Sequence, residues 1–288
     1  PTPVSALLHA GVINLGGFLW LRLFPVLDSF SAGHLILLAV GGFTATVGVL
    51  TMMSQASVKH ALAWSTSAQM GFMLFEIGMG AYTLAFLHLL AHSLYKAHSF
   101  LASGRTVAAS RVPPFARAAP GSRLLWGSGV GGAALLLLLL NPTLVESNPV
   151  LGAILVLAVS GAVVGLPAGL KIQHKLLLSS LALALVPLYG VLHGLLGPVV
   201  RSPEGFVLPF TGVVIGMTVV GTLVLLSLML LFKPRGRWLR AMRLHVSHGF
   251  YLGLPFDSLT TKFSNALRQL KPNRQRSDDG MSTLGETS

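Results

Sequence analysis

Eight long runs of apolar residues dominate the chain. They cover about residues 4–24, 33–53, 57–79, 81–103, 124–141, 150–170, 176–197 and 208–232. Each run approaches or exceeds the length of about 20 residues that a helix needs to cross a bilayer core. The runs are continuous, whereas transmembrane strands are shorter and alternate apolar with polar positions. The pattern predicts an all-α fold, a polytopic transmembrane helical bundle of about eight spans.

Glycines inside these runs are expected to allow close packing of helices, because small residues let two backbones approach each other in lipid. Six glycines are the candidates for such contacts: Gly16, Gly17, Gly41, Gly42, Gly161 and Gly165.

The composition supports a membrane protein. Of 288 residues, 53% are hydrophobic and only 10% are charged, and the mean hydropathy is +0.74. A soluble domain carries about 25% charged residues, because its surface must face water. The chain has no cysteine, which excludes disulfides, iron–sulfur clusters, cysteine-bound zinc and thiol catalysis within it.

The basic residues gather on one side of the predicted topology. Four arginines lie in the 104–123 loop, two lysines in the 171–175 loop, and ten Lys or Arg residues follow position 232. The other side holds only Arg22 and Arg201 among its basic residues. Because cytoplasmic loops carry excess Lys and Arg, both Pro1 and the tail are predicted to be cytoplasmic. The net charge of +12 is therefore a topology signal, and we expect no nucleic-acid partner.

Five regions follow from this topology. Residues 1–104 contain four spans, 105–123 form a cytoplasmic basic loop, and 124–232 contain four further spans. Residues 233–272 are expected to form cytoplasmic amphipathic helices over 235–251 and 256–270, the second of them capped by Asp257 or Ser258. Their apolar stripes pack against the membrane face, the same chain or a partner subunit. Residues 273–288 have almost nothing to bury and are expected to be disordered.

Ionisable residues inside the fourth run are the main functional candidates. His88, His92 and Lys96 are spaced four residues apart, so they line one face over about 12 Å of helix. Histidine titrates near neutral pH, and a desolvated lysine can lose its proton, so such a column can pass protons through intervening waters. The alternative is that these side chains only bond neighbouring helices. Three ionisable residues on one helix face favour proton translocation over a purely structural role.

Three further ionisable residues lie in the first and third runs. His9 lies one and a half to two turns from the cytoplasmic end of the first. Lys59 opens the third, where it either joins the ion route or extends to the interface. Glu76 lies about 26 Å along the helix from Lys59, so the two cannot pair. Glu76 either reaches the outer interface or lies on an ion route.

Motifs for metal or covalent chemistry are absent from the sequence. The chain has no HEXXH, P-loop, GxGxxG after a strand or nucleophile elbow. Lys96 stands where a third ligand would follow His88 and His92. We therefore expect no metal, no cofactor and no catalytic step in this chain.

Three segments carry a resemblance to a known family. PTPVSALLHA, SVKHALAWSTSAQMGFM and HLLAHSLYKAHSFLASG resemble the antiporter-like membrane subunits of complex I and of Mrp cation/proton antiporters. The resemblance covers residues 1–104. It implies that His9, Lys59, His88, His92 and Lys96 belong to a polar axis that carries protons. It also implies that a key lysine and its glutamate partner precede Pro1, so the chain is expected to be the C-terminal part of a longer protein.

The second half departs from complex I. Subunit L has a further buried lysine in this region, whereas residues 124–232 have no lysine inside a predicted span. LLHAGVINLGGFL and AQMGFMLFEIGMGA are more similar to the DabB type of subunit in inorganic-carbon accumulation complexes. This resemblance implies a bacterial inner-membrane subunit that couples an ion gradient to carbon dioxide and bicarbonate accumulation. The implied partner is a cytoplasmic, zinc-containing, carbonic-anhydrase-like subunit.

Two alternatives to this function stay open. One is a proton-pumping subunit of NADH-quinone oxidoreductase or a Mrp-type antiporter, with respiratory or antiporter membrane subunits as partners. The other is a membrane scaffold whose polar residues only hold helices together. The translocated ion is expected to be a proton, with sodium as the alternative.

Overall fold

The structure, a computed structural model, describes residues 2–27, 31–105, 119–145, 148–167, 169–200, 207–232, 245–251 and 253–270. Each predicted run coincides with a helix or a helical series in this part. The first run is a series of α1 (Thr2–Leu7), the π-helix η1 (Leu8–Val12) and α2 (Asn14–Leu27). The others are α3 (Ser31–Ser54), α4 (Val58–Gly78), α5 (Tyr82–Ala102), α7 (Pro120–Leu140), α8 (Pro149–Val164), α9 (Ile172–Val200) and α10 (Phe210–Phe232).

Length and composition confirm the membrane assignment. Within the described residues, five helical segments are long and apolar enough to cross a membrane: Thr2–Leu23, α3, α7, α9 and Phe210–Met229. Helix α8 is equally apolar but shorter. Helices α4 and α5 contain most of the charged and histidine side chains singled out above, which lowers their hydropathy. The fold is an all-α polytopic membrane bundle.

Several helix boundaries differ from the prediction. Helix α7 begins at Pro120, four residues early, so Arg123 of the predicted basic loop lies in its first turn. Helix α8 ends at Val164, six residues early, because Gly165 and Pro167 follow and proline cannot continue a helix. Helix α9 begins at Ile172, four residues early. Lys175 therefore lies in the first turn of α9, and not in the preceding loop.

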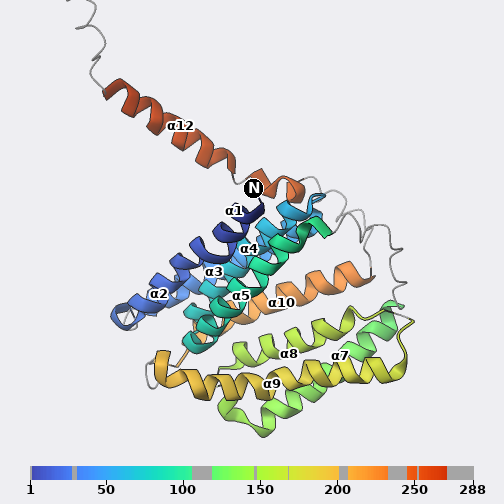
Figure 1. Ribbon diagram of the computed structural model, residues 1–288. Helices are drawn as coiled ribbons and strands as arrows, with labels where there is room; N and C mark the ends of the chain where they lie inside the picture. Colours follow the sequence, from blue (N-terminus) through green and yellow to red (C-terminus); the bar gives the residue numbers. More distant parts are fainter. Residues whose placement is uncertain are drawn as a thin grey trace, which may run out of the picture.

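The helices form two groups joined by α10. Helices α1–α5 make one group and α7–α9 the other, with α10 between them (Figure 1). Leu38, Phe75, Val150 and Val220 form a buried cluster that links α3, α4, α8 and α10. A second cluster includes Val130, Val159 and Val186 and holds α7, α8 and α9 together.

Helices α3 and α4 approach each other backbone to backbone. A Cβ on Gly41 would lie 2.6 Å from the Phe75 nitrogen, and one on Gly71 would lie 2.6 Å from the Ala45 nitrogen. Close packing is thus confirmed at Gly41, and also at Gly17 and Gly42, where side chains fill the space. The prediction of close packing is wrong at three other glycines, where a Cβ would meet open space: Gly16, Gly161 and Gly165.

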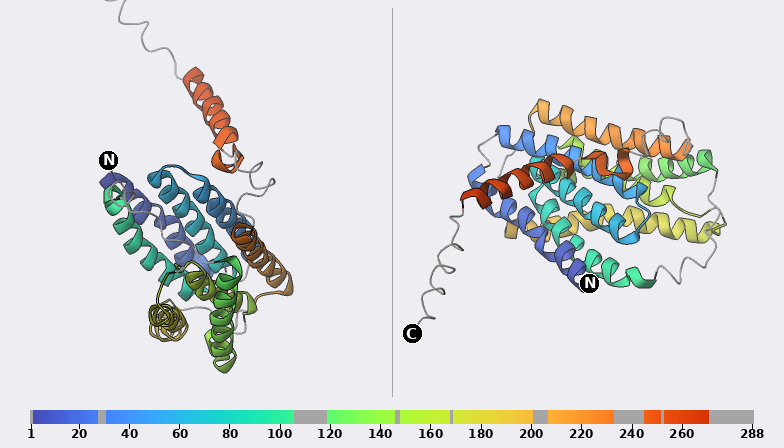
Figure 2. Two further views of the ribbon diagram at one scale, coloured as in Figure 1. Left: turned by 90° about the vertical axis from the view of Figure 1, so that its right-hand side faces the viewer. Right: turned by 90° about the horizontal axis from the view of Figure 1, so that it is seen from above.

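The start of α1 and the segment His245–Tyr251 lie at the same end of the bundle, here called the tail end (Figure 1). From this end, α12 (Gly253–Leu270) runs out from the bundle (Figures 1 and 2). Residues 106–118 of the predicted basic loop, 233–244 of the first amphipathic segment, and 271–288 with the predicted disordered tail lie outside the described residues.

Three expectations for the tail are corrected. A helix over 235–251 cannot continue to its end, because Gly249, Phe250 and Tyr251 have left-handed φ angles of 61°, 54° and 56°. Neither Asp257 nor Ser258 caps the second helix, since α12 begins four residues before Asp257, at Gly253. The apolar stripe predicted for this helix does not pack against the described chain at Leu259 and Phe263, which are 62% and 68% exposed.

Candidate functional site

Helix α5 presents a buried polar column, defined here as His88, His92 and Lys96. His92 is 0% exposed and Lys96 is 1% exposed. The ring centroids of His88 and His92 lie 6.2 Å apart, which is one helical turn. A charged or polar group buried in lipid is costly unless it is paired, so the partners of each member define what the column can do.

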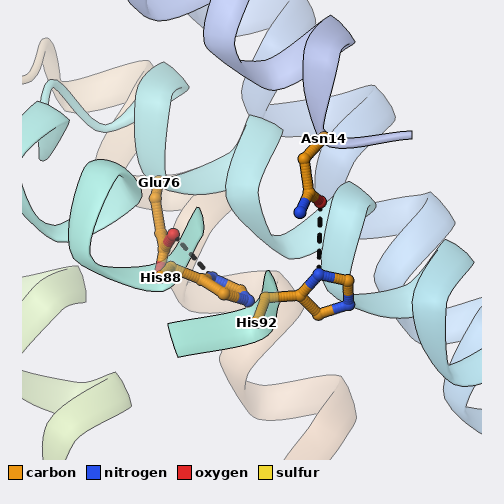
Figure 3. A network of polar contacts seen from close by, with 4 residues as sticks. All are labelled: Asn14, Glu76, His88 and His92. Carbon is orange, nitrogen blue, oxygen red and sulfur yellow. Dashed lines mark hydrogen bonds and ion pairs between the residues drawn. The ribbon is translucent and has the colours of Figure 1, made fainter. Parts of the chain in front are cut away.

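His88 forms an ion pair with Glu76 of α4. The Glu76 Oε2 atom lies 2.9 Å from His88 Nδ1, and the two side chains are 2% and 10% exposed (Figure 3). Helices α4 and α5 are antiparallel neighbours joined by a short turn, which brings these residues together. Glu76 is thus buried among the helices, in the last turn of α4.

His92 is held by Asn14, the first residue of α2 (Figure 3). The Asn14 amide nitrogen donates to the Ala10 carbonyl at 2.8 Å, and to Ser93 Oγ at 2.7 Å. A carbonyl can only accept, so the amide oxygen of Asn14 faces His92, 3.2 Å from Nδ1. The Nδ1–H of His92 therefore donates this bond. The other ring nitrogen, Nε2, is buried with no hydrogen-bond partner among the described residues.

Lys96 reaches back to α4 at the tail end of the column. Its ammonium donates to the Leu62 carbonyl at 3.1 Å and also to Ser65 Oγ. The ammonium lies 5.7 Å from the Tyr95 ring centroid. The described residues place no carboxylate in an ion pair with Lys96, so neutral oxygens hold this cation in place.

His9 lies in the π-helical turn between α1 and α2. The Ile13 amide donates to the Leu8 carbonyl, five residues back, at 3.1 Å, and such turns occur frequently at functional sites. The His9 ring stacks on Phe100, with centroids 4.8 Å apart and planes 6° apart. Its Nδ1 atom is buried without a hydrogen-bond partner in the described part of the chain. Phe100 follows Lys96 by one turn, so His9 extends the column toward the tail end.

Lys59 lies apart from the column. It is exposed in the first turn of α4, one turn before Leu62. This position fits the interfacial alternative. The structure thus brings His9, Glu76, His88, His92 and Lys96 along one path and leaves Lys59 at its tail-end margin.

Sequence reasoning missed two side-chain partners of the column, Asn14 and Ser65, and also Ser93, which accepts from Asn14. Uncharged polar residues are common in membrane helices, so nothing in the sequence singled them out. The Glu76–His88 pair had a usable signal. Only three residues separate α4 from α5, so the last turn of α4 must lie beside the first turns of α5.

The arrangement is suited to acid–base exchange. No group of three His, Asp or Glu side chains gathers as possible metal ligands in the described ranges. In contrast, Glu76 and the column together offer a carboxylate, two imidazoles and an amine, each able to hold or release a proton.

Comparison with known proteins connects these residues to characterised sequences. The family model described as "NADH:quinone oxidoreductase/Mrp antiporter, TM" matches residues 1–197, more than half of the chain. A protein of Hydrogenovibrio crunogenus named "Probable inorganic carbon transporter subunit DabB" is 49% identical over 136 residues, which are 47% of this chain and 26% of that protein.

Two further relatives represent the two kinds of protein that the sequence resembles, inorganic carbon transporter subunits and quinone oxidoreductase subunits. "Probable inorganic carbon transporter subunit DabB2" of Halothiobacillus neapolitanus is 37% identical over 202 residues, 67% of this chain and 36% of that protein. "NAD(P)H-quinone oxidoreductase subunit 5, chloroplastic" of Mesostigma viride is 39% identical over 108 residues, 37% of this chain and 17% of that protein. The matches thus cover between 17% and 36% of the length of these three relatives.

Proposed function

The chain belongs to the NADH:quinone oxidoreductase/Mrp antiporter transmembrane family, and from this premise we propose that it moves protons across a bacterial inner membrane along the polar column of α5. We further propose that this flow drives the accumulation of inorganic carbon by a partner subunit. One observation carries the first proposal: a buried carboxylate–imidazole pair, Glu76–His88, is followed by His92 and Lys96 on one helix face.

Proton movement follows from the bonds within the column. His92 holds one proton on Nδ1, facing Asn14, and its Nε2 can accept another. A proton taken up there is released toward His88, where Glu76 stabilises the imidazolium, or toward Lys96. Neighbouring groups one turn apart are too distant for a direct hydrogen bond, so waters or side-chain rotation must connect them.

The free ring nitrogens argue against a purely structural role. A scaffold stabilised by hydrogen bonds would satisfy its buried polar atoms, because an unpaired one costs about 1–3 kcal/mol. His92 Nε2 and His9 Nδ1 are both buried and have no hydrogen-bond partner in the described ranges. A proton relay needs such accepting sites, which supports translocation over the scaffold alternative.

The tail end is proposed to face the cytoplasm. Sixteen of the twenty Lys and Arg residues lie in three stretches of the chain: residues 104–123, residues 171–175 and the residues after α10. Protons on the cytoplasmic side would then exchange near His9 and Lys96, and those on the outer side near Glu76 and His88.

The carbon assignment is supported by the named relatives. Two bacterial relatives carry the name of an inorganic carbon transporter subunit. This chain has no motif for hydration chemistry, so we propose that a cytoplasmic, zinc-containing, carbonic-anhydrase-like subunit supplies it. The exposed apolar residues of α12 offer that subunit a surface beside the cytoplasmic end of the column.

A short segment could link such a partner to the ion route. The Gln55 side chain donates to the Ser247 carbonyl at 3.2 Å, which fixes the segment His245–Tyr251 on the end of α3. Gly249 lies against Trp64 so closely that a Cβ would be 2.7 Å from the ring. Trp64 precedes Ser65, the partner of Lys96. A movement of α12 would thus be transmitted to the part of α4 that binds Lys96.

A second candidate function is proton pumping in a quinone oxidoreductase or Mrp-type complex. The match to the chloroplast quinone oxidoreductase subunit favours it. Against it, Lys171 and Lys175 are the only lysines between residues 124 and 232. Lys175 lies in the first turn of α9, at the margin of the bundle and not at its centre.

Purification of the full-length protein in mild detergent separates these candidates. A zinc-containing subunit recovered in equal amount, together with loss of bicarbonate accumulation when either gene is deleted, would support the proposal. Recovery of quinone oxidoreductase subunits would favour the second candidate. A subunit that transports ions fully while alone would contradict both.

A further inference from the structure

A cavity of about 330 Å³ lies between the two helix groups, away from the polar column. It is bounded by α3, α7, α10 and the end of α8, and its lining includes Val49, Met53, Arg123, Gly165, Leu223 and Ser227. The lining on α10 extends from Leu223 to Leu231, about 12 Å of helix. This part of the lining therefore runs along the helix, the direction in which a lipid chain would run beside it.

Among the described residues that line the cavity, Arg123 is the only charged one. It follows the start of α7 by one turn, so it lies near the tail end of that helix. Its Nε–H donates to the Val164 carbonyl at 2.8 Å, which fixes the guanidinium at the rim. That bond uses one of five N–H donors. No carboxylate forms an ion pair with Arg123 in the part of the chain that the structure describes.

We propose that this cavity is a binding site for one anionic phospholipid, with the phosphate on Arg123 and an acyl chain along α10. A fixed cation at the rim of an apolar groove is complementary to an anionic amphiphile. Basic pockets between transmembrane helices bind such headgroups. The lipid would fill the seam between α3 of the first group and α7 and α8 of the second, and so hold the two groups together.

Two glycines give a matched pair of variants. A Cβ on Gly165 would meet nothing within 4 Å, and this residue lines the cavity, so Gly165→Phe fills the space without a backbone clash. Gly161 lies one turn earlier on α8, is equally open and does not line the cavity, so Gly161→Phe is the control. Arg123→Gln removes the charge and keeps hydrogen-bonding capacity.

Native mass spectrometry of the whole chain, titrated with phosphatidylglycerol or phosphatidylcholine, tests the proposal. The unsubstituted chain should retain one phosphatidylglycerol in preference to phosphatidylcholine. Arg123→Gln should weaken retention of phosphatidylglycerol about fivefold, which corresponds to about 1 kcal/mol for one basic residue. Gly165→Phe should weaken retention of both lipids, and Gly161→Phe should leave it unchanged.

Two results would overturn the proposal. One is equal lipid retention by all the variants. The other is retention that Gly165→Phe leaves intact while inorganic phosphate alone abolishes it, because that would identify a free phosphate site and not a lipid site.

Discussion

The Oε2 atom of Glu76 lies 2.9 Å from Nδ1 of His88, and both side chains are almost fully enclosed by the bundle. Glu76 is the only acidic residue in the eight predicted runs. Its position opposite the first histidine of the column gives a buried imidazolium a counter-charge at one end only. His92 and Lys96 have neutral partners, so we propose that the carboxylate of Glu76 sets an electrostatic gradient along α5.

Glu76→Gln tests this gradient. The amide has the size of the carboxylate and can still bond to His88, but it cannot stabilise a positive charge there. We expect at least a tenfold loss of proton flux in vesicles, with normal amounts of protein in the membrane. Asp257→Asn, which removes an exposed carboxylate from α12, is the control and should leave that flux unchanged. Unaltered flux in Glu76→Gln would show that the pair is structural.

Asn14→Ala tests the orientation of His92. The change removes the oxygen that accepts from His92 Nδ1 and the donor to Ser93 Oγ. Hydrogen bonds between membrane helices contribute about 0.6 kcal/mol each, so the loss of stability should be about 1 kcal/mol. Proton flux should fall far more than this small loss explains, and Asn14→Gln should recover part of it. A thermal melt and a flux assay on the same samples distinguish the two effects.

The sequence predicted the bundle because apolar run length and helix rise depend only on local composition. It also predicted that His88, His92 and Lys96 share a face, since that follows from helix periodicity. The residues that pack against this face depend on how the helices are arranged. The helical periodicity of the sequence does not determine that arrangement. Asn14 and Ser65 were missed for this reason.

Two local features also could not be predicted from the hydrophobic pattern of the sequence. The π-helical turn at His9 adds one residue to a turn without any change in hydrophobicity. The amphipathic stripe of α12 was visible, but the stripe did not reveal that Leu259 and Phe263 face away from the rest of the chain. An apolar face specifies that something covers it and not what that is.

Gly71→Ala tests the contact that aligns α3 with α4. The added methyl would lie 2.6 Å from the Ala45 nitrogen, so the helices must separate. Overpacking of this kind costs about 1–3 kcal/mol, and it should also shift Ser65 and Glu76 on α4. Gly161→Ala adds the same methyl in open space and should leave the melting temperature unchanged or slightly raised. Equal melting temperatures for the two variants would contradict the close contact.

A reporter fused after Lys271 tests the proposed orientation. The eight helical segments return the chain to the side on which α1 starts, and the excess of basic residues on that side predicts that it faces the cytoplasm. A reporter that is active only in the cytoplasm should therefore be active, and one that needs export should be silent. Activity of the exported form would overturn the topology.

Proton flux measured in the His92→Ala variant is the most direct test of proton translocation along the polar column. The full-length protein is placed in vesicles with an internal pH dye, and a membrane potential drives protons inward. His98→Ala is the matched control, because His98 lies on the same helix but is exposed and outside the column. If the column carries the ion, His92→Ala abolishes flux, as should His88→Ala and Lys96→Ala, while His98→Ala keeps it. Flux at the unsubstituted rate in His92→Ala would contradict translocation along this face of α5.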